Sequence, residues 1–332
     1  MPKVSALPYT RLLMLLAGVL AVLLFLELIA GRHPVSPGQI WAVLTAEGDS
    51  ATRRILLEFR LPKALTGLLC GAGLAVGGLL TQSLFRNPLT GPDILGLTSG
   101  AGLAVALAIL TGLPLGATGQ TGMAIAGSAA TFLLLTAISR KVGNHGLLVA
   151  GVMISAFTSS VVASLQAWSG AADLQRFTVW GFGSISQTGI SETGMMAVPV
   201  VLGIGLGLLV SQGLDAMGLS DDYARSVGVN VRHVRRMVLT ATALLTGAIT
   251  SFCGPISFIG IAAPHLVKRL TGLNDHRKLI PVSALAGAIL VLGCDLLTML
   301  PGNGAVLPLN AITALAGAPV VLWAILTFRN NG

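Results

Sequence analysis

Residues 64–84, ALTGLLCGAGLAVGGLLTQSL, form an apolar stretch that contains no charged side chain. A bilayer with a hydrocarbon core ~30 Å thick is crossed by a helix of ~20 such residues. The same kind of stretch recurs in both directions along the chain, between short segments that hold most of the charges. We therefore predict ten membrane-spanning helices. The predicted spans are residues 12–30, 64–84, 94–110, 122–138, 146–167, 195–211, 237–252, 256–267, 279–300 and 305–327.

The composition favours the same fold class. Of the 332 residues, 54% are hydrophobic and only 10% are charged, with a mean hydropathy of +0.85. A soluble domain carries about 25% charged residues, and a disordered chain combines high charge with low hydrophobicity. Both classes are excluded. The 42 glycines suit helices that pack closely inside a membrane. We predict an all-α polytopic membrane protein in which residues 1–332 form one domain.

The basic residues set the predicted orientation. With the N-terminus in the cytoplasm and ten alternating spans, most of the 20 lysines and arginines fall on the cytoplasmic side, as the positive-inside rule requires. The outer side receives only Arg32, Arg53, Arg54, Arg60, Lys63 and Arg176. Both termini are then cytoplasmic. A signal peptide is the alternative for residues 12–30, but that segment exceeds the usual ~7–15 residues of such a core.

Two charges, one short span and one loop call for a specific interpretation. Glu27 and Asp295 are the charges inside the predicted spans. Residues 256–267 are short and bounded by prolines, which fits either a half-helix lining a transport route or a structural re-entrant segment. The outer loop 168–194 carries aromatic residues, which fit an interfacial belt or a short helix gating a cavity mouth.

Several kinds of chemistry are missing from the sequence. No phosphate-binding GxxxxGK[ST] loop is present, so we do not expect the chain to hydrolyse ATP itself. No Ser-His-Asp or HExxH arrangement is visible, and no metal or nucleic-acid site is expected. Buried free thiols are expected at Cys70, Cys253 and Cys294. A transporter subunit or a membrane anchor fits better than an enzyme.

The cytoplasmic segment 212–236 is the candidate site at which an energy-supplying partner would act on this chain. Ser220 is a plausible helix N-cap followed by Asp221 and Asp222, and Gly228 then interrupts the pattern. Two short surface helices around a turn could dock into a partner. A solvated charged loop is the alternative.

Three motifs, in matching order and spacing, resemble the FecCD-type family of ABC importer permeases for ferric siderophores, haem and vitamin B12. They are RNPLTGPDILG at 86–96, SDDYARSVGV at 220–229, and GPISFIGIAAPHLVKRLTG at 254–272 with HRKLIPVSALAGA at 276–288. The resemblance spans roughly residues 55 to 327. It implies a type II importer permease bundle in the cytoplasmic (inner) membrane, with a second permease copy, two ABC ATPase subunits that use ATP and magnesium, and a periplasmic or extracellular substrate-binding protein.

The resemblance also assigns roles to individual positions. It implies that Arg60 and Lys63 receive acidic residues of the binding protein, although interfacial snorkelling would explain them too. It places the cytoplasmic gate at Asn87 and Leu89 together with Asn144 and His145. Asp295 matches an acidic family position, for which we favour a structural ion pair. Contact with the ATPases is implied for Ser220, Asp221, Asp222, Ala224, Arg225, Gly228 and Val229.

Two departures from the family pattern, Met299 and Asn310, bear on docking and on specificity. Residues 92–96, PDILG, are closer to the ferric-chelate members, so we expect a ferric siderophore as cargo, with haem and then vitamin B12 as alternatives. A stand-alone secondary transporter or channel is the rival class, but it normally needs ionisable groups at mid-membrane. A membrane anchor that moves no substrate is the third interpretation.

Overall fold

The computed structural model describes residues 8–31, 34–45, 49–300 and 306–328, and in these ranges it contains helices and connecting segments but no strand. Seven helices are long and apolar enough to cross a membrane, and α5 and α15 add shorter apolar helices. The elements are α1 Tyr9–Ile29, α2 Pro37–Leu44, α3 Ser50–Arg54, the π-helix η1 Ile55–Arg60, α4 Leu61–Phe85, the 3-10 helix η2 Pro92–Leu95, α5 Leu97–Leu110, α6 Ala117–Ser139, α7 Asn144–Trp168, α8 Ala171–Gly181, α9 Ile190–Leu209, α10 Ser211–Leu219, α11 Asp221–Ser226, α12 Val231–Cys253, α13 Ile259–Thr271, α14 His276–Thr298 and α15 Leu309–Phe328.

Each of the ten predicted spans coincides with one of these helices. The boundaries differ by a few residues, because the apolar pattern does not mark the polar turns that continue a helix beyond the hydrocarbon core. The predicted short segment 256–267 corresponds to α13, which starts after a left-handed residue at Phe258. Residue 305, at the start of the last predicted span, lies outside the described residues, as do residues 1–7 and 329–332 at the two termini.

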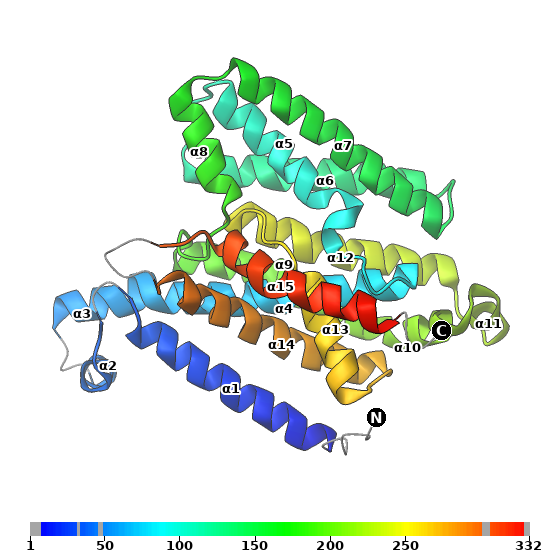
Figure 1. Ribbon diagram of the computed structural model, residues 1–332, viewed down its shortest axis with the longest axis horizontal. Coiled ribbons are helices and arrows are strands. Elements are labelled where there is room, and N and C mark those ends of the chain that lie inside the picture. The colour runs from blue at the N-terminus through cyan, green and yellow to red at the C-terminus, as the bar shows by residue number, and fades with distance from the viewer. Residues whose placement is uncertain (1–7, 32–33, 46–48, 301–305, 329–332) are drawn as a thin grey trace.

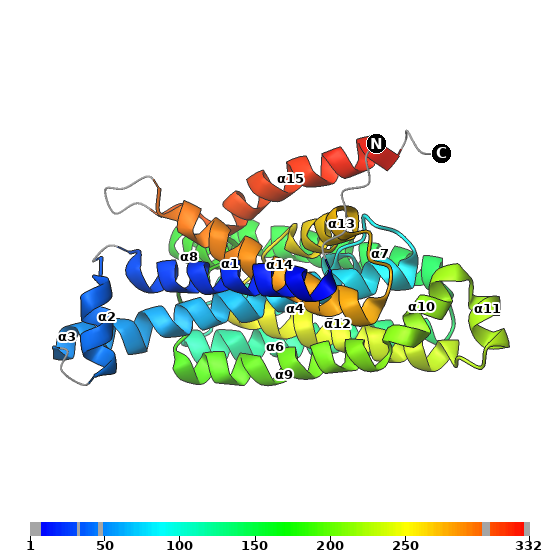
Figure 2. The same ribbon diagram turned by 90° about the horizontal axis from the view of Figure 1, so that it is seen from below.

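Helix α4 lies at the centre of the bundle (Figures 1 and 2). It is buried along most of its length and packs against α14, α12, α13 and α9. A second group forms around α5, which packs on α6, α7 and α8. Helix α1 packs against α14 at the periphery of the bundle. The central helix therefore contacts both the N-terminal and the C-terminal parts of the chain.

Glycine makes the close approach of these helices possible. A Cβ on Gly78 would overlap the backbone carbonyl of Gly260 in α13, and one on Gly71 would overlap the carbonyl of Gly287 in α14. Because lipid is as apolar as the side chains, association inside a membrane depends on such packing rather than on the hydrophobic effect. The free cysteines Cys70, Cys253 and Cys294 are buried, as predicted.

The bundle has two functionally distinct ends. Helices α10 and α11 project at one end, and α2, α3 and η1 lie at the other (Figures 1 and 2). The described N-terminal end of α1 and the C-terminal end of α15 are both at the α11 end. This arrangement agrees with the prediction that both termini share a side with segment 212–236.

Candidate coupling, gating and docking sites

The predicted coupling segment is folded as two short helices, α10 and α11, before α12 begins. The Ser220 hydroxyl accepts a hydrogen bond from the backbone N–H of Tyr223 (2.9 Å), which makes it the N-cap of α11. Ala224 is fully buried and anchors the helix to the bundle. Gly228 has φ +85°, a left-handed conformation that glycine adopts at little cost, and it ends the helix. The helical alternative, rather than a solvated loop, is therefore correct.

The two acids of α11 have different surroundings. Asp222 is 93% exposed and pairs with Arg225 one turn later (2.9 Å). Asp221 instead forms an ion pair with Arg86, the first residue after α4. Arg86 Nε also donates to the Met217 carbonyl of α10 (2.8 Å). Thus Asp222 and Arg225 are available to a partner, whereas Asp221 joins the coupling segment to the bundle.

The predicted gate loop follows Arg86 directly. Asn87 folds the loop on itself, because its Oδ1 accepts from the Leu89 N–H (3.0 Å) and its carbonyl accepts from the Thr90 hydroxyl (2.7 Å). The Leu89 side chain is 39% exposed at the tip. An apolar side chain held on a tight polar turn is suited to closing a hydrophobic constriction.

Asp93 stabilises the far side of the same loop. Its Oδ1 accepts a hydrogen bond from the Thr98 hydroxyl at the start of α5 (2.8 Å). Burial raises the pKa of the Asp93 carboxyl, and the Thr98 hydrogen bond opposes this rise. This contact fixes η2 against α5.

The second pair of predicted gate residues is divided between two roles. Asn144 Nδ2 donates to the Leu84 carbonyl near the end of α4 (2.8 Å), so the start of α7 is joined to the helix that leads into the gate loop. His145 is exposed. Asn87, Leu89 and Asn144 thus lie near the end of α4, and His145 is exposed.

Arg60 and Lys63, the predicted docking residues, are turned inward. Arg60 is 7% exposed and its Nη1 donates to the Leu28 carbonyl of α1 (2.5 Å). Residues 55–60 form a π-helix within one continuous helix that runs from Ser50 to Phe85. Arg60 is the last residue of this π-helix, and its side chain contacts α1. Both side chains are thus largely buried in this conformation, and their contact with a binding protein stays a prediction.

Lys63 belongs to a buried ion cluster of three helices. Its Nζ lies 3.0 Å from Glu27 of α1 and also contacts Asp295 of α14. The side chains of Glu27, Lys63 and Asp295 are 0, 12 and 6% exposed. Asp295 therefore makes the structural ion pair favoured above, and Lys63 is the cation between two acids. Exposed cations at this end are Arg53 and Arg54, with Arg54 paired to Glu58 (2.9 Å).

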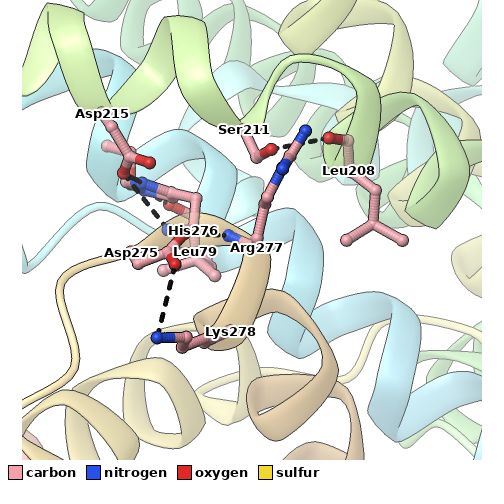
Figure 3. A network of polar contacts seen from close by, with 9 residues as sticks. Leu79, Leu208, Ser211, Asp215, Asp275, His276, Arg277 and Lys278 are labelled. Carbon is pink, nitrogen blue, oxygen red and sulfur yellow. Dashed lines mark hydrogen bonds and ion pairs between the residues drawn. The ribbon is translucent and has the colours of Figure 1, made fainter.

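A Ser-His-Asp arrangement, which the sequence did not reveal, joins α4, α10 and α14. His276 Nδ1 lies 2.5 Å from Asp215 Oδ1, and His276 Nε2 lies 2.5 Å from the Ser83 hydroxyl. Figure 3 shows Asp215 reaching from α10 to His276 at the start of α14. The Ser83 hydroxyl also lies 2.8 Å from the Leu79 carbonyl of its own helix, so the network ties α4 to α10 and α14. Long-range contacts of this kind leave no signal in sequence spacing.

The outer loop, and Asn310 at the position that differs from the family pattern, also have defined contacts. Trp168 is 95% exposed, as an interfacial belt requires, whereas Trp180 of α8 stacks on Phe177 (centroids 5.9 Å apart) and packs toward α5. Asn310 joins α15 to two other segments, because its N–H donates to the Phe182 carbonyl and its Oδ1 accepts from the Ser257 N–H (both 3.0 Å). Within the described residues, no group of three or more His, Cys, Asp or Glu is placed to hold a metal ion.

The sequence model of the FecCD transport family matches residues 19–327. The chain belongs to the FecCD transport family. The vitamin B12 import system permease protein BtuC of Klebsiella pneumoniae subsp. pneumoniae is 35% identical over 320 residues, covering 95% of this chain and 93% of that protein. BtuC of Escherichia coli O9:H4 (strain HS) is 35% identical over 325 residues, covering 96% of each chain.

A solved structure supports the same fold. An inward-facing structure of a transporter described as the metal-chelate ABC type superposes with a TM-score of 0.86 at 30% identity, and the match covers 96% of this chain and 99% of that one. The predicted family and all-α permease fold are thus confirmed. This FecCD-family chain is a multi-pass membrane permease of the ABC importer type.

Proposed function

We propose that this permease carries a metal chelate inward, most favourably a ferric siderophore, through a pathway that separate ATPase subunits open and close. The observation that supports this most strongly is the arrangement at one end of the bundle. There α11 presents Asp222 and Arg225 outward, while Asp221 is paired with Arg86 at the start of the gate loop. A partner that moves α11 also moves the gate.

The mechanism follows from these contacts. ATP and magnesium bind and react in two partner ATPase subunits, and the change in their spacing displaces α10 and α11. The Arg86 contacts to Asp221 and Met217 transmit that displacement to the end of α4. Leu89 then leaves or re-enters the constriction. Each step needs a difference in free energy between the two states, because a partner that binds both equally shifts neither.

The other partners are a second permease copy and a binding protein that delivers the chelate. For the binding protein, we retain Arg60 and Lys63 as residues that could contribute only if a rearrangement exposes them. The accessible cations at the α3 end are Arg53 and Arg54. Charge attraction at these arginines would accelerate encounter with an acidic partner, and more so at low salt.

The cargo has a second candidate. Residues 92–96 favour a ferric siderophore, and haem remains an alternative. Vitamin B12, itself a cobalt chelate, gains support because the relatives at 35% identity are vitamin B12 import permeases. A panel of a ferric hydroxamate, haem and cyanocobalamin distinguishes the three.

The experiment tests coupling through α11. We would co-express the permease with ABC ATPase subunits and a substrate-binding protein and measure ATPase activity in proteoliposomes with each chelate. Asp222→Lys should abolish substrate-stimulated activity. Asp173→Lys is the matched control, since Asp173 also pairs with an arginine three residues later (Arg176, 3.4 Å) but lies in α8. Equal loss in both variants, or none in either, would refute the proposal.

A further inference from the structure

A basic pocket lies where α6 ends and α12 begins, at the end of the bundle that carries α11. Its cavity of about 550 Å³ is lined by Arg140 and Lys141 after α6 and by Arg232, Arg235 and Arg236 in the first turns of α12. No carboxylate lines it, and in the part of the chain that the structure describes none of these five cations forms an ion pair. Such a concentration of one sign of charge attracts an anion.

Arg235 is the deepest of the five cations. Its Nη1 donates to the Val142 carbonyl (3.3 Å), while its buried Nε has no hydrogen-bond partner. The acid within electrostatic reach is Asp221, whose carboxylate is already paired with Arg86, and Arg225 adds further positive charge. The chain's own acids therefore leave this pocket uncompensated.

An apolar cavity of about 320 Å³ lies further along the same two helices. Its walls include Ala129 and Phe132 of α6, Leu244 and Phe252 of α12, and Pro199 of α9. On α12 it begins at Thr240, one turn from Arg236, whose carbonyl accepts the Thr240 hydroxyl (2.9 Å). Only a minority of the residues in α6 and α9 are buried inside the bundle.

We propose that the basic pocket and the apolar cavity together bind an anionic phospholipid of the inner leaflet, with the phosphate among the arginines and an acyl chain in the cavity. Basic pockets at the cytoplasmic ends of membrane helices are suited to such headgroups. An acidic surface of a partner subunit would satisfy the charges. It would leave the apolar cavity on the same helices unexplained, whereas a lipid accounts for both observations.

The proposal is tested by native mass spectrometry of the detergent-solubilised permease with cardiolipin, phosphatidylglycerol and phosphatidylcholine of matched chains. The wild type should retain the anionic lipids at least about tenfold better than phosphatidylcholine. Arg232→Gln with Arg236→Gln should reduce that preference by roughly tenfold or more, since two cations near a membrane at about 1 kcal/mol each correspond to roughly thirtyfold. Arg53→Gln with Arg54→Gln, at the other end, should lose none. Ala129→Phe, which fills the apolar cavity, should weaken retention of every lipid.

Three results would overturn the proposal. The first is equal retention of phosphatidylcholine and anionic lipids. The second is displacement of cardiolipin by glycerol phosphate at equal concentration, which would make the pocket a site for free phosphate. The third is a double arginine variant that keeps its lipid preference but no longer co-purifies with the ATPase, which would assign the pocket to that partner. Thermal unfolding of each variant establishes that it is folded.

Discussion

Arg86 and Asp221 form an ion pair although 135 residues separate them in the sequence. Arg86 is the first residue after α4 and adopts a left-handed conformation (φ 51°), and its side chain reaches both α10 and α11. The contact joins the segment expected to meet the ATPases to the loop expected to gate the pathway. Arg86 thus contacts the candidate coupling segment and directly precedes the candidate gate loop.

A charge exchange tests this contact. Arg86→Asp should sharply reduce substrate-stimulated ATPase activity, and adding Asp221→Arg should restore much of it. Aspartate is among the residues that tolerate a left-handed backbone, so the change adds little strain. Because the pair is partly exposed, we expect its loss to change the free energy of unfolding by only ~0.2–1 kcal/mol. If the exchanged pair is as inactive as the single variant, the contact does not transmit motion.

The buried ion cluster makes a prediction about stability. Lys63→Met leaves Glu27 and Asp295 without their cation, and removing one partner of a buried pair costs ~3–5 kcal/mol. Thermal unfolding in detergent should show a large loss of stability in Lys63→Met. Adding Glu27→Gln and Asp295→Asn to that variant should restore the stability. Arg54→Met breaks an exposed pair with Glu58 and serves as the control, with a loss of ~0.2–1 kcal/mol. Similar stability of the two single variants would contradict a structural role for Lys63.

Two adjacent glycines of α4 offer a matched comparison. A Cβ at Gly78 would overlap the Gly260 carbonyl, whereas one at Gly77 would meet nothing nearer than Pro92 Cβ at 3.6 Å. Gly78→Ala should therefore separate α4 from α13 and cost ~1–3 kcal/mol or more, as overpacked cores do. Gly77→Ala should be nearly neutral. Yield and unfolding temperature in detergent measure both, and equal effects would mean that the two helices are not in close contact.

The His276 network makes a prediction about the α10 connection. His276→Ala removes the side-chain partner of Asp215 and of the Ser83 hydroxyl, which should cost ~0.5–1.5 kcal/mol for each hydrogen bond lost, because Asp215 is partly exposed and Ser83 keeps its contact with the Leu79 carbonyl. Faster hydrogen exchange in α10 would report the loosened contact. His145→Ala, at an exposed histidine, is the control. If exchange in α10 is unchanged, the network does not hold that helix.

Regular and local features could be predicted from the sequence. Each of the ten apolar stretches falls on a helix, since a span must be long and uncharged wherever it meets lipid, and seven of the described helices are long and apolar enough to cross a membrane. The N-cap at Ser220 and the turn at Gly228 depend on residues three or fewer positions away, so the motif alone identified them. The family resemblance assigned the gate to the loop that holds Asn87 and Leu89, and this assignment stays a prediction.

Contacts between distant residues could not be predicted in the same way. The resemblance suggested that Arg60 and Lys63 contact a binding protein, and nothing in the sequence marks the π-helix at 55–60 or the contacts that these side chains make with α1 and α14. The pairing of Lys63 with Glu27 and Asp295, and of His276 with Asp215 and Ser83, depends on how three helices pack. Spacing along the chain does not carry that information.

The central claim, that this permease moves its cargo only when partner ATPases drive it, is tested by uptake into proteoliposomes. Vesicles containing the permease, the two ATPase subunits and ATP should accumulate the chelate that the binding protein delivers. Vesicles with the permease alone, or with ATPases whose hydrolysis is blocked, should accumulate none. Accumulation by the permease alone would contradict the account.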